Sequence, residues 1–243
     1  MKPSFAVVIP MFNEQSGAEK CISEVSHSLK QIDATSKIIV VDDGSSDNTP
    51  RILKGLLEIN QNLCVLIHKQ NQGYGVALKT GIKKAQELGL SYVLFMDSDL
   101  TNQPADIIHF FKKMELSADV IKATRYSDGG KVVGVPLKRR LISMIGNVIS
   151  RTLFRLPITD PTNGFRALRT SIANNINYKE KGFPIIMEEL YLLAGMKLTY
   201  ENVPVTLKNR NTQGRESSFL YTPSQIFNYL KYPLMAFFRI YRS

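Results

Sequence analysis

The stretch Tyr92-Val93-Leu94-Phe95-Met96-Asp97-Ser98-Asp99 runs from a short apolar segment directly into two carboxylates. The apolar part is continuous rather than alternating, which predicts a strand buried on both faces. Residues two apart on a strand share a face, so both carboxylates can point into one site. Ligands of open α/β sheets bind beyond the carboxyl ends of the strands. The stretch therefore predicts a parallel sheet and a polar site at its edge.

Three similar apolar runs precede this strand, and segments with helical periodicity separate them. The runs are Phe5–Ile9, Ile38–Val41 and Leu63–Ile67, and the helical segments are 15–29, 49–59 and 75–88. A helix near 104–116 and a strand at Val120–Thr124 continue the series. Strand–helix alternation of this kind is typical of a parallel α/β sheet flanked by helices. We therefore predict an α/β fold.

The pattern changes after residue 125. We predict a loop at 127–136, a basic amphipathic helix at 137–155, an irregular segment at 156–170, a helix at 183–193 and a strand at 198–210 interrupted by Pro204. No Gly/Ser-rich linker divides the chain. We therefore expect one domain over residues 1–215, with a first half at 4–125, a second half at 126–215, and a C-terminal amphipathic segment at 216–243.

Composition excludes several classes of protein. The chain has 243 residues, 44% of them hydrophobic and 21% charged, which excludes disordered and collagen-like proteins. Two cysteines are too few for a disulfide framework and indicate a reducing compartment. No uncharged apolar run approaches the ~18 residues that a membrane span needs. The net charge is +10, and the basic excess lies after residue 120, so an anionic partner is expected there.

The other strands also end in polar loops. Pro10–Glu14 offers the Phe12 ring for stacking on a base and the Glu14 carboxylate for recognising it. Val41–Asp47 offers Asp42 and Asp43 as acceptors for base or ribose donors. Asn71–Gly75 opens a helix, a usual place for phosphate or ribose contacts. Asp97 and Asp99 suit Mg²⁺ or Mn²⁺ bridging a diphosphate; a polar turn in which Asp99 caps the next helix is the alternative.

These four loops together resemble the nucleotide-sugar half of family-2 glycosyltransferases of the GT-A fold. The resemblance covers residues 4–125 and implies a Rossmann-like, mostly parallel sheet. It implies that Asp97 and Asp99 hold the metal ion. The residues that it implies for binding the nucleotide sugar are Pro10, Phe12, Asn13, Glu14, Val41, Asp42, Asp43, Gln72, Gly73, Asp97 and Ser98.

The second half resembles the polyprenyl-phosphate glycosyltransferases of the dolichol-phosphate mannose synthase type. The elements that carry the likeness are Thr124–Tyr126, Asp128–Gly134, Pro136–Ser143, Asp160–Arg166, Glu188–Leu190 and Arg210 with Gly214 and Ser217. The resemblance implies that Arg125, Arg139 and Ser143 bind the acceptor phosphate, with Arg210 as a further contact. It makes Asp97, Asp99, Arg125 and Arg139 the catalytic set.

The sequence departs from this family's pattern at two places. Thr101 stands where the family often has a glutamine two residues after the second aspartate. Ser217-Ser218 stands where the family has a lysine, with Arg215 nearby. These differences concern the third metal contact and the donor sugar.

The predicted function is metal-dependent, inverting transfer of a hexose from a UDP- or GDP-linked sugar to a polyprenyl phosphate. The phosphate is mostly dianionic at neutral pH because its second pKa is about 6, so it needs no protein base. His27, His68 and His109 stand singly and are expected to be structural or exposed. A family-2 glycosyltransferase acting on a soluble glycan is the alternative. A nucleic-acid-binding module is a remote one, so no nucleic-acid partner is expected.

Two segments are candidates for membrane contact. In Leu137–Leu156 apolar residues recur at helical spacing among arginines, which fits either a core-packing helix with a basic side or a membrane-facing helix. Ile226–Arg242 is aromatic-rich, carries only positive charges and is expected to break at Pro233. This mixture is typical of an interfacial helix at an anionic membrane, with oligomer contacts as the alternative. We expect a peripheral protein on the cytoplasmic face of a membrane, and a homo-oligomer is an open alternative.

Overall fold

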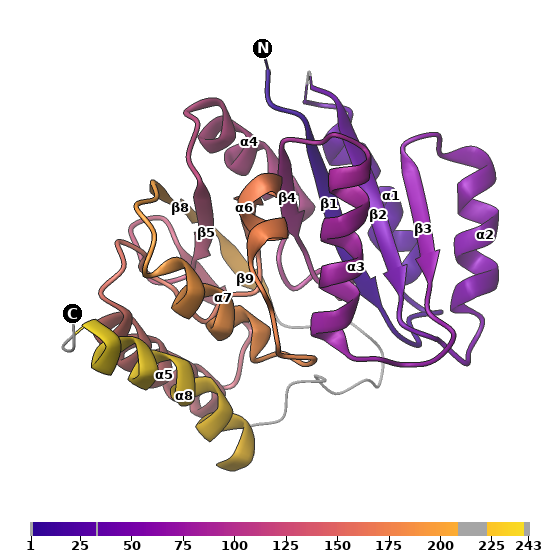
Figure 1. Ribbon diagram of the computed structural model, residues 1–243. Helices are drawn as coiled ribbons and strands as arrows, with labels where there is room; N and C mark the ends of the chain where they lie inside the picture. Colours follow the sequence, from indigo (N-terminus) through magenta and orange to yellow (C-terminus); the bar gives the residue numbers. More distant parts are fainter. Residues whose placement is uncertain (1, 33, 209–222, 241–243) are drawn as a thin grey trace.

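A twisted seven-stranded sheet forms the centre of the described chain (Figure 1). The computed structural model describes residues 2–32, 34–208 and 223–240. The strand order is β3-β2-β1-β4-β7-β5-β8. The bounds are β1 Phe5–Met11, β2 Ser36–Asp42, β3 Leu63–Ile67, β4 Tyr92–Phe95, β5 Val120–Thr124, β7 Arg166–Arg169 and β8 Tyr200–Pro204. The mostly parallel α/β sheet predicted from the sequence is confirmed.

Helices cover both faces of the sheet. One face carries α1 (Ala18–Leu29), α2 (Thr49–Ile59) and α4 (Ile107–Glu115), which follows a short 3₁₀ turn, η1 (Pro104–Asp106). The other carries α3 (Tyr74–Glu87), α6 (Thr170–Asn175) and α7 (Ile185–Leu193). Successive residues of β1 divide between the two cores, Val7 with the first and Val8 with the second. A Cβ at Gly81 would lie 2.3 Å from Val8 Cγ1, so only glycine lets α3 approach β1 this closely.

Three elements of the second half were not expected from the sequence. Strand β7 lies within the segment expected to be irregular and pairs antiparallel with both β4 and β5. Strand β6 (Lys131–Val133) lies within the expected loop and pairs with β9 (Thr206–Lys208). The third is α6, a single short helix directly after β7. All three are short, and short segments carry too few residues to show a period.

Two long helices lie side by side beneath α7 (Figure 1). These are α5 (Leu137–Phe154) and α8 (Pro223–Ile240). The expected break at Pro233 is wrong, because α8 continues through this residue. Pro233 is buried within α8, although a proline cannot donate a helical hydrogen bond. No helix of the described residues is both long and apolar enough to cross a membrane.

Candidate functional site

The carboxyl end of β4 presents the two aspartates of the motif. Asp97 Oδ1 accepts a hydrogen bond from the Tyr74 hydroxyl at 3.0 Å. Asp99 Oδ1 accepts hydrogen bonds from Thr101 N at 3.0 Å and from Thr101 Oγ1 at 2.8 Å. Thr101 therefore folds back onto Asp99 in a polar turn. Asp99 does not cap the next helix, because the N-cap residues of η1 and α4 are Gln103 and Asp106. Between the two aspartates of the motif, Ser98 is nearly buried.

The donor set at this strand end suits a hard divalent cation. Carboxylate oxygens are the ligands that Mg²⁺ and Mn²⁺ prefer, and Mg²⁺ is commonly held by one or two carboxylates plus substrate phosphates. Among the described residues, no group of three or more His, Cys, Asp and Glu side chains could hold a metal ion. An ion held by Asp97 and Asp99 would therefore take its other ligands from a diphosphate or from water.

The end of β2 places Asp42 against the turn that follows it. Its Oδ1 accepts hydrogen bonds from Ser45 N at 3.0 Å and from Ser45 Oγ at 2.5 Å. Its Oδ2 is buried and has no hydrogen-bond partner among the described residues. A buried carboxylate oxygen without a donor is costly, so a ligand N–H or hydroxyl would find a ready acceptor here.

Asp43 is held by three donors of its own chain. His68 Nδ1 lies 2.6 Å from Oδ1, and the backbone N–H groups of Gln72 and Gly73 donate to Oδ1 and Oδ2 at 3.0 and 2.7 Å. His68 Nε2 lies 2.9 Å from Thr80 Oγ1. His68 is therefore structural, as expected, and it supports the loop that follows β3. Asp43 follows β2 and His68 follows β3, so no local pattern indicates this contact.

The N-terminus of α3 is closed by a segment from the second half. Gly75 N donates to Lys181 O at 2.7 Å, and a Cβ at Gly73 would lie 2.5 Å from the same oxygen. Gly73 also has a φ of +103°, which favours glycine. Gln72, Gly73 and Gly75 thus donate their backbone N–H groups inside the protein. The contacts of this loop with a phosphate or ribose stay a prediction.

The loop after β1 combines an exposed ring with buried polar groups. Phe12 is 44% exposed and lies beyond the strand end, where a flat ligand could stack on it. Glu14 is nearly buried, and its backbone N–H donates to Thr49 Oγ1 at 2.8 Å. Asn13 Oδ1 accepts from Ser46 N at 2.8 Å, which ties this loop to the one after β2. Pro10 pairs with Val41 in the parallel register of β1 and β2.

A second polar cluster surrounds Arg125, just after β5. Its Nη1 lies 3.4 Å from Ser143 Oγ on α5, so the structure brings these two predicted acceptor residues together. The Tyr126 hydroxyl lies 3.3 Å from the same Ser143 oxygen. Arg125 Nε and Nη2 donate to the two carboxylate oxygens of Asp160 at 2.6 and 2.9 Å, and Nη2 also donates to Thr162 Oγ1.

Asp160 is the buried partner that fixes the Arg125 guanidinium. Burial raises the pKa of a carboxyl group, but the charge and hydrogen bonds of Arg125 outweigh it and hold the pKa of Asp160 below its usual value. Asp160 therefore stays ionised and keeps Arg125 in one orientation. Asp160 and Thr162 lie within the motif Asp160–Arg166, and nothing in that local sequence indicates that they bind Arg125.

Two predicted acceptor residues cannot be placed in the cluster. Arg139 belongs to α5, but its side chain lies outside the described part of the structure. Arg210 lies outside the described residues altogether. Their roles stay predictions.

The acidic pair on α7 has an internal role. Both Glu189 oxygens bind the buried Arg166 guanidinium, with Oε2 at 3.0 Å from Nη2. Glu188 accepts hydrogen bonds from the backbone N–H groups of Lys179 and Glu180, both at 2.9 Å. These residues matched the acceptor side of the family pattern, and the structure shows them holding the 179–182 segment and β7 in place.

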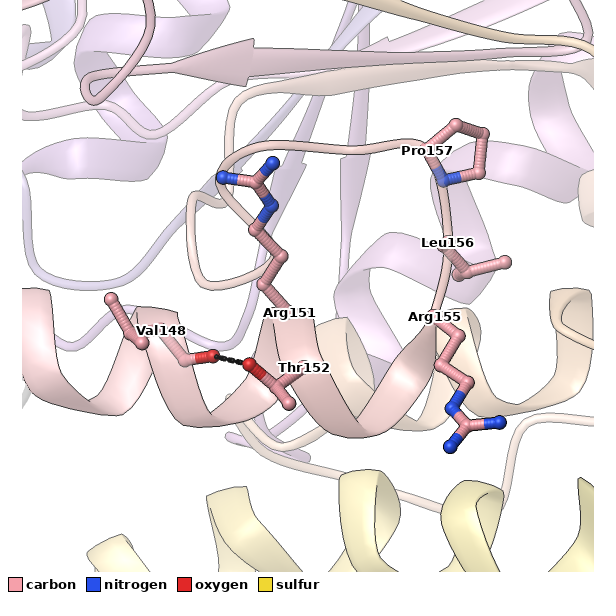
Figure 2. A pocket seen from close by; sticks show the side chains of 6 residues that line it. All are labelled: Val148, Arg151, Thr152, Arg155, Leu156 and Pro157. Carbon is pink, nitrogen blue, oxygen red and sulfur yellow. Dashed lines mark hydrogen bonds between the residues drawn. The ribbon is translucent and has the colours of Figure 1, made fainter. Parts of the chain in front are cut away.

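A hollow of about 480 Å³ lies at the C-terminal end of α5 (Figure 2). Its lining residues are Val148, Arg151, Thr152, Arg155, Leu156 and Pro157. Figure 2 shows the Arg151 and Arg155 guanidinium groups pointing away from each other, so they do not form a shared anion clamp. Arg155 instead lies over the Phe237 ring of α8 at 5.6 Å.

Known proteins share this fold and sequence pattern. Polyprenol monophosphomannose synthase of Mycolicibacterium smegmatis is 27% identical over 208 residues, covering 84% of this chain and 77% of the relative. Dolichol-phosphate mannosyltransferase of Pyrococcus furiosus is 31% identical over 205 residues, covering 83% of this chain and 55% of the relative. Among solved structures, glucosyl-3-phosphoglycerate synthase of Mycobacterium tuberculosis, in complex with Mn²⁺, uridine diphosphate and phosphoglyceric acid, superposes with a TM-score of 0.64. It is 18% identical and covers 88% of this chain and 72% of its own.

The family described as Glycosyl transferase family 2 matches residues 6–176. This range includes the ends of β1 to β4, the Arg125 cluster and all of α5. The chain belongs to glycosyltransferase family 2.

Proposed function

We propose that this chain transfers a hexose, with inversion, from a nucleoside-diphosphate sugar to a polyprenyl phosphate. The two relatives named above act, by their names, on polyprenyl or dolichyl phosphates. The observation that carries the proposal in the structure is the juxtaposition of Arg125 and Ser143 beside an exposed apolar helix face.

The donor would lie along the ends of β1, β2 and β4. Phe12 offers a stacking surface for the base, and Asp42 Oδ2 offers an acceptor without a partner in the described chain. Pro10, Asn13, Glu14, Val41, Asp43, Gln72, Gly73 and Ser98 would shape this site. Asp97 and Asp99 would hold Mg²⁺ or Mn²⁺, which when bound neutralises charge developing on the departing diphosphate.

The acceptor phosphate would lie against Arg125 and Ser143, with Arg139 and Arg210 as further contacts. A phosphate oxygen attacks the anomeric carbon, the bond to the nucleoside diphosphate breaks, and the configuration inverts. The acceptor phosphate is already dianionic, so the protein needs to bind and orient it but does not need to remove a proton from it. Arginine suits this role because its fork meets two phosphate oxygens and keeps its charge when partly desolvated.

The outer face of α5 supports a lipid acceptor. The residues that α5 buries include Asn147 and Ser150, whereas it exposes Leu141, Ile145 and Val148, the last by 58%. A helix that turns polar residues inward and apolar residues outward needs an apolar surrounding. The neighbouring α8 exposes Phe227 and Phe238 in the same way. We propose that both helices lie on the cytoplasmic face of a membrane, near the polyprenyl tail.

A panel of sugar nucleotides tests the proposal. The purified chain would be incubated with Mn²⁺, radiolabelled UDP- and GDP-linked hexoses, and vesicles with or without a polyprenyl phosphate. We expect butanol-extractable radiolabelled lipid with one donor, only when the polyprenyl phosphate is present. Label recovered only on a soluble glycan would instead support the alternative, a glycosyltransferase with a non-lipid acceptor.

A further inference from the structure

Tyr74 connects the start of α3 to the first aspartate of the β4 motif. Its hydroxyl donates to Asp97 Oδ1 at 3.0 Å, across 23 positions in the sequence. A carboxylate oxygen can only accept a hydrogen bond, so the phenol is the donor in this pair.

Stacking on a second aromatic ring fixes the position of the Tyr74 ring. It stacks on Phe183 with ring centroids 4.6 Å apart and an interplanar angle of 26°. The segment that carries Phe183 is tied to α3 through the hydrogen bond from Gly75 N to Lys181 O, and to α8 through the Tyr229 hydroxyl, which donates to Phe183 O at 3.3 Å. The hydroxyl is thus held in position before any ligand binds.

The loop that precedes β7 also comes close to Asp97 and Tyr74. A Cβ on Gly164 would lie 3.5 Å from Asp97 Oδ2 and 3.6 Å from the Tyr74 hydroxyl. Gly164 therefore lies near both the hydroxyl and the carboxylate. A carboxylate that follows a strand end can rotate about two side-chain bonds, and the hydrogen bond from Tyr74 restricts that rotation.

We propose that Tyr74 is a positioning residue that orients Asp97 to bind the divalent cation. This inference rests on the proposed function, in which Asp97 and Asp99 hold the ion. Partners that hydrogen-bond a metal-ligating carboxylate fix its orientation, and their loss commonly lowers metal affinity or activity by about 10- to 100-fold. The fold supplies this partner from α3 rather than from the aspartate motif itself.

Removing the hydroxyl tests the proposal, with a matched control on the same strand. Tyr74→Phe deletes the donor to Asp97. Tyr92→Phe deletes a comparable buried hydroxyl, which donates to Ala118 O at 2.9 Å at the opposite end of β4. Electron paramagnetic resonance would measure free Mn²⁺ in titrations of each full-length protein with UDP or GDP present and no lipid. Melting temperatures and nucleotide affinity without metal would be measured in parallel.

We expect Tyr74→Phe to raise the Mn²⁺ dissociation constant by about 10-fold or more, and Tyr92→Phe to leave it within about twofold. In transfer assays, the Tyr74→Phe defect should shrink as Mn²⁺ is raised, which a general loss of stability would not produce. Phe183→Leu keeps the Tyr74 hydroxyl but removes the ring that stacks on Tyr74, and it should raise the Mn²⁺ dissociation constant by a smaller factor. This second variant tests the proposal even if Tyr74→Phe folds poorly.

Equal Mn²⁺ affinity in wild type, Tyr74→Phe and Phe183→Leu would overturn the role of Tyr74 while leaving the proposed function intact. A wild-type protein that binds no Mn²⁺ with either nucleotide would overturn the metal assignment, and this inference with it.

Discussion

The two halves of the molecule build their polar sites differently. In the first half, loops that follow parallel strands bond to one another at a shared edge: Asn13 N donates to Ser45 Oγ at 2.8 Å, joining the loops after β1 and β2. In the second half, Arg125 forms hydrogen bonds with Ser143 of α5 and with Asp160, which lies 35 residues further along the chain. The order of the sheet brings the loops of the first site together, whereas the second site depends on how segments outside the sheet pack. The two should therefore respond differently to mutation.

The largest effect is expected from the first site. Asp97→Asn or Asp99→Asn removes charge where the diphosphate departs, which costs several kcal/mol of transition-state stabilisation, or about 10³-fold in rate. Both side chains lie just beyond a strand rather than in the core, so the melting temperature should change little. Initial transfer rates with Mn²⁺ and with EDTA measure this. Normal turnover of both variants in EDTA would contradict the metal site.

Mutation of the second site should impair transfer to the acceptor without weakening donor binding. Arg139→Ala is expected to lower transfer to polyprenyl phosphate by about 10²- to 10³-fold, by analogy with removing one oxyanion-hole donor. Nucleoside-diphosphate affinity should be unchanged. Arg140→Ala, the next residue on α5, is the matched control and should retain most transfer. If Arg139→Ala weakens nucleotide binding and spares lipid transfer, the residue belongs to the first site.

The free energy of unfolding should also depend on pH, because of one buried amine in the second half. Lys122 Nζ donates to Pro161 O and Asn163 O at 3.1 and 2.6 Å, and burial first, then the charge of Arg166, lowers the pKa of Lys122 to about 7. Between that pH and the ordinary pKa of 10.5, the unfolded chain binds one more proton than the native protein. The contribution of Lys122 to the free energy of unfolding therefore rises with pH, by up to about 1.4 kcal/mol per pH unit.

Urea unfolding of wild type and Lys122→Met between pH 6 and 9.5 would isolate this contribution. The unfolding free energy of wild type minus that of the variant should increase with pH above about 7. A flat or falling difference would show that Lys122 does not lose its proton in this range.

The smallest effect is expected at the exposed face of α5. Val148→Glu replaces a side chain that is 58% exposed, so the fold should tolerate it. Losing about 1 kcal/mol of apolar burial in lipid would weaken vesicle binding by about fivefold. Flotation with anionic vesicles measures this. Ile59→Glu, at an 80% exposed position of the first half, is the control and should not change vesicle binding. Equal losses in both variants would argue against α5 as the membrane face.

The first half could largely be predicted because its signals are local. Each buried strand is a continuous apolar run, each is followed by its polar loop, and parallel pairing brings those loops to one edge. The Asp97 and Asp99 pair could be recognised without knowing any contact. The course of α5 could also be predicted, since its 18 residues show a clear helical period.

Only the tertiary structure decided which groups face each other. The sequence predicts the same role for Asp43 and Gly73, which is to bind the nucleotide sugar. In the fold, however, Gly73 N donates a hydrogen bond to Asp43 Oδ2 at 2.7 Å. The sequence does not reveal that Tyr74 reaches Asp97, or that Asp160 fixes Arg125. Nor does the helical period of α5 tell which face is covered, because that depends on how α5 packs against α8. Periodicity reports the pattern within a segment; contacts between segments come from packing, which no local pattern contains.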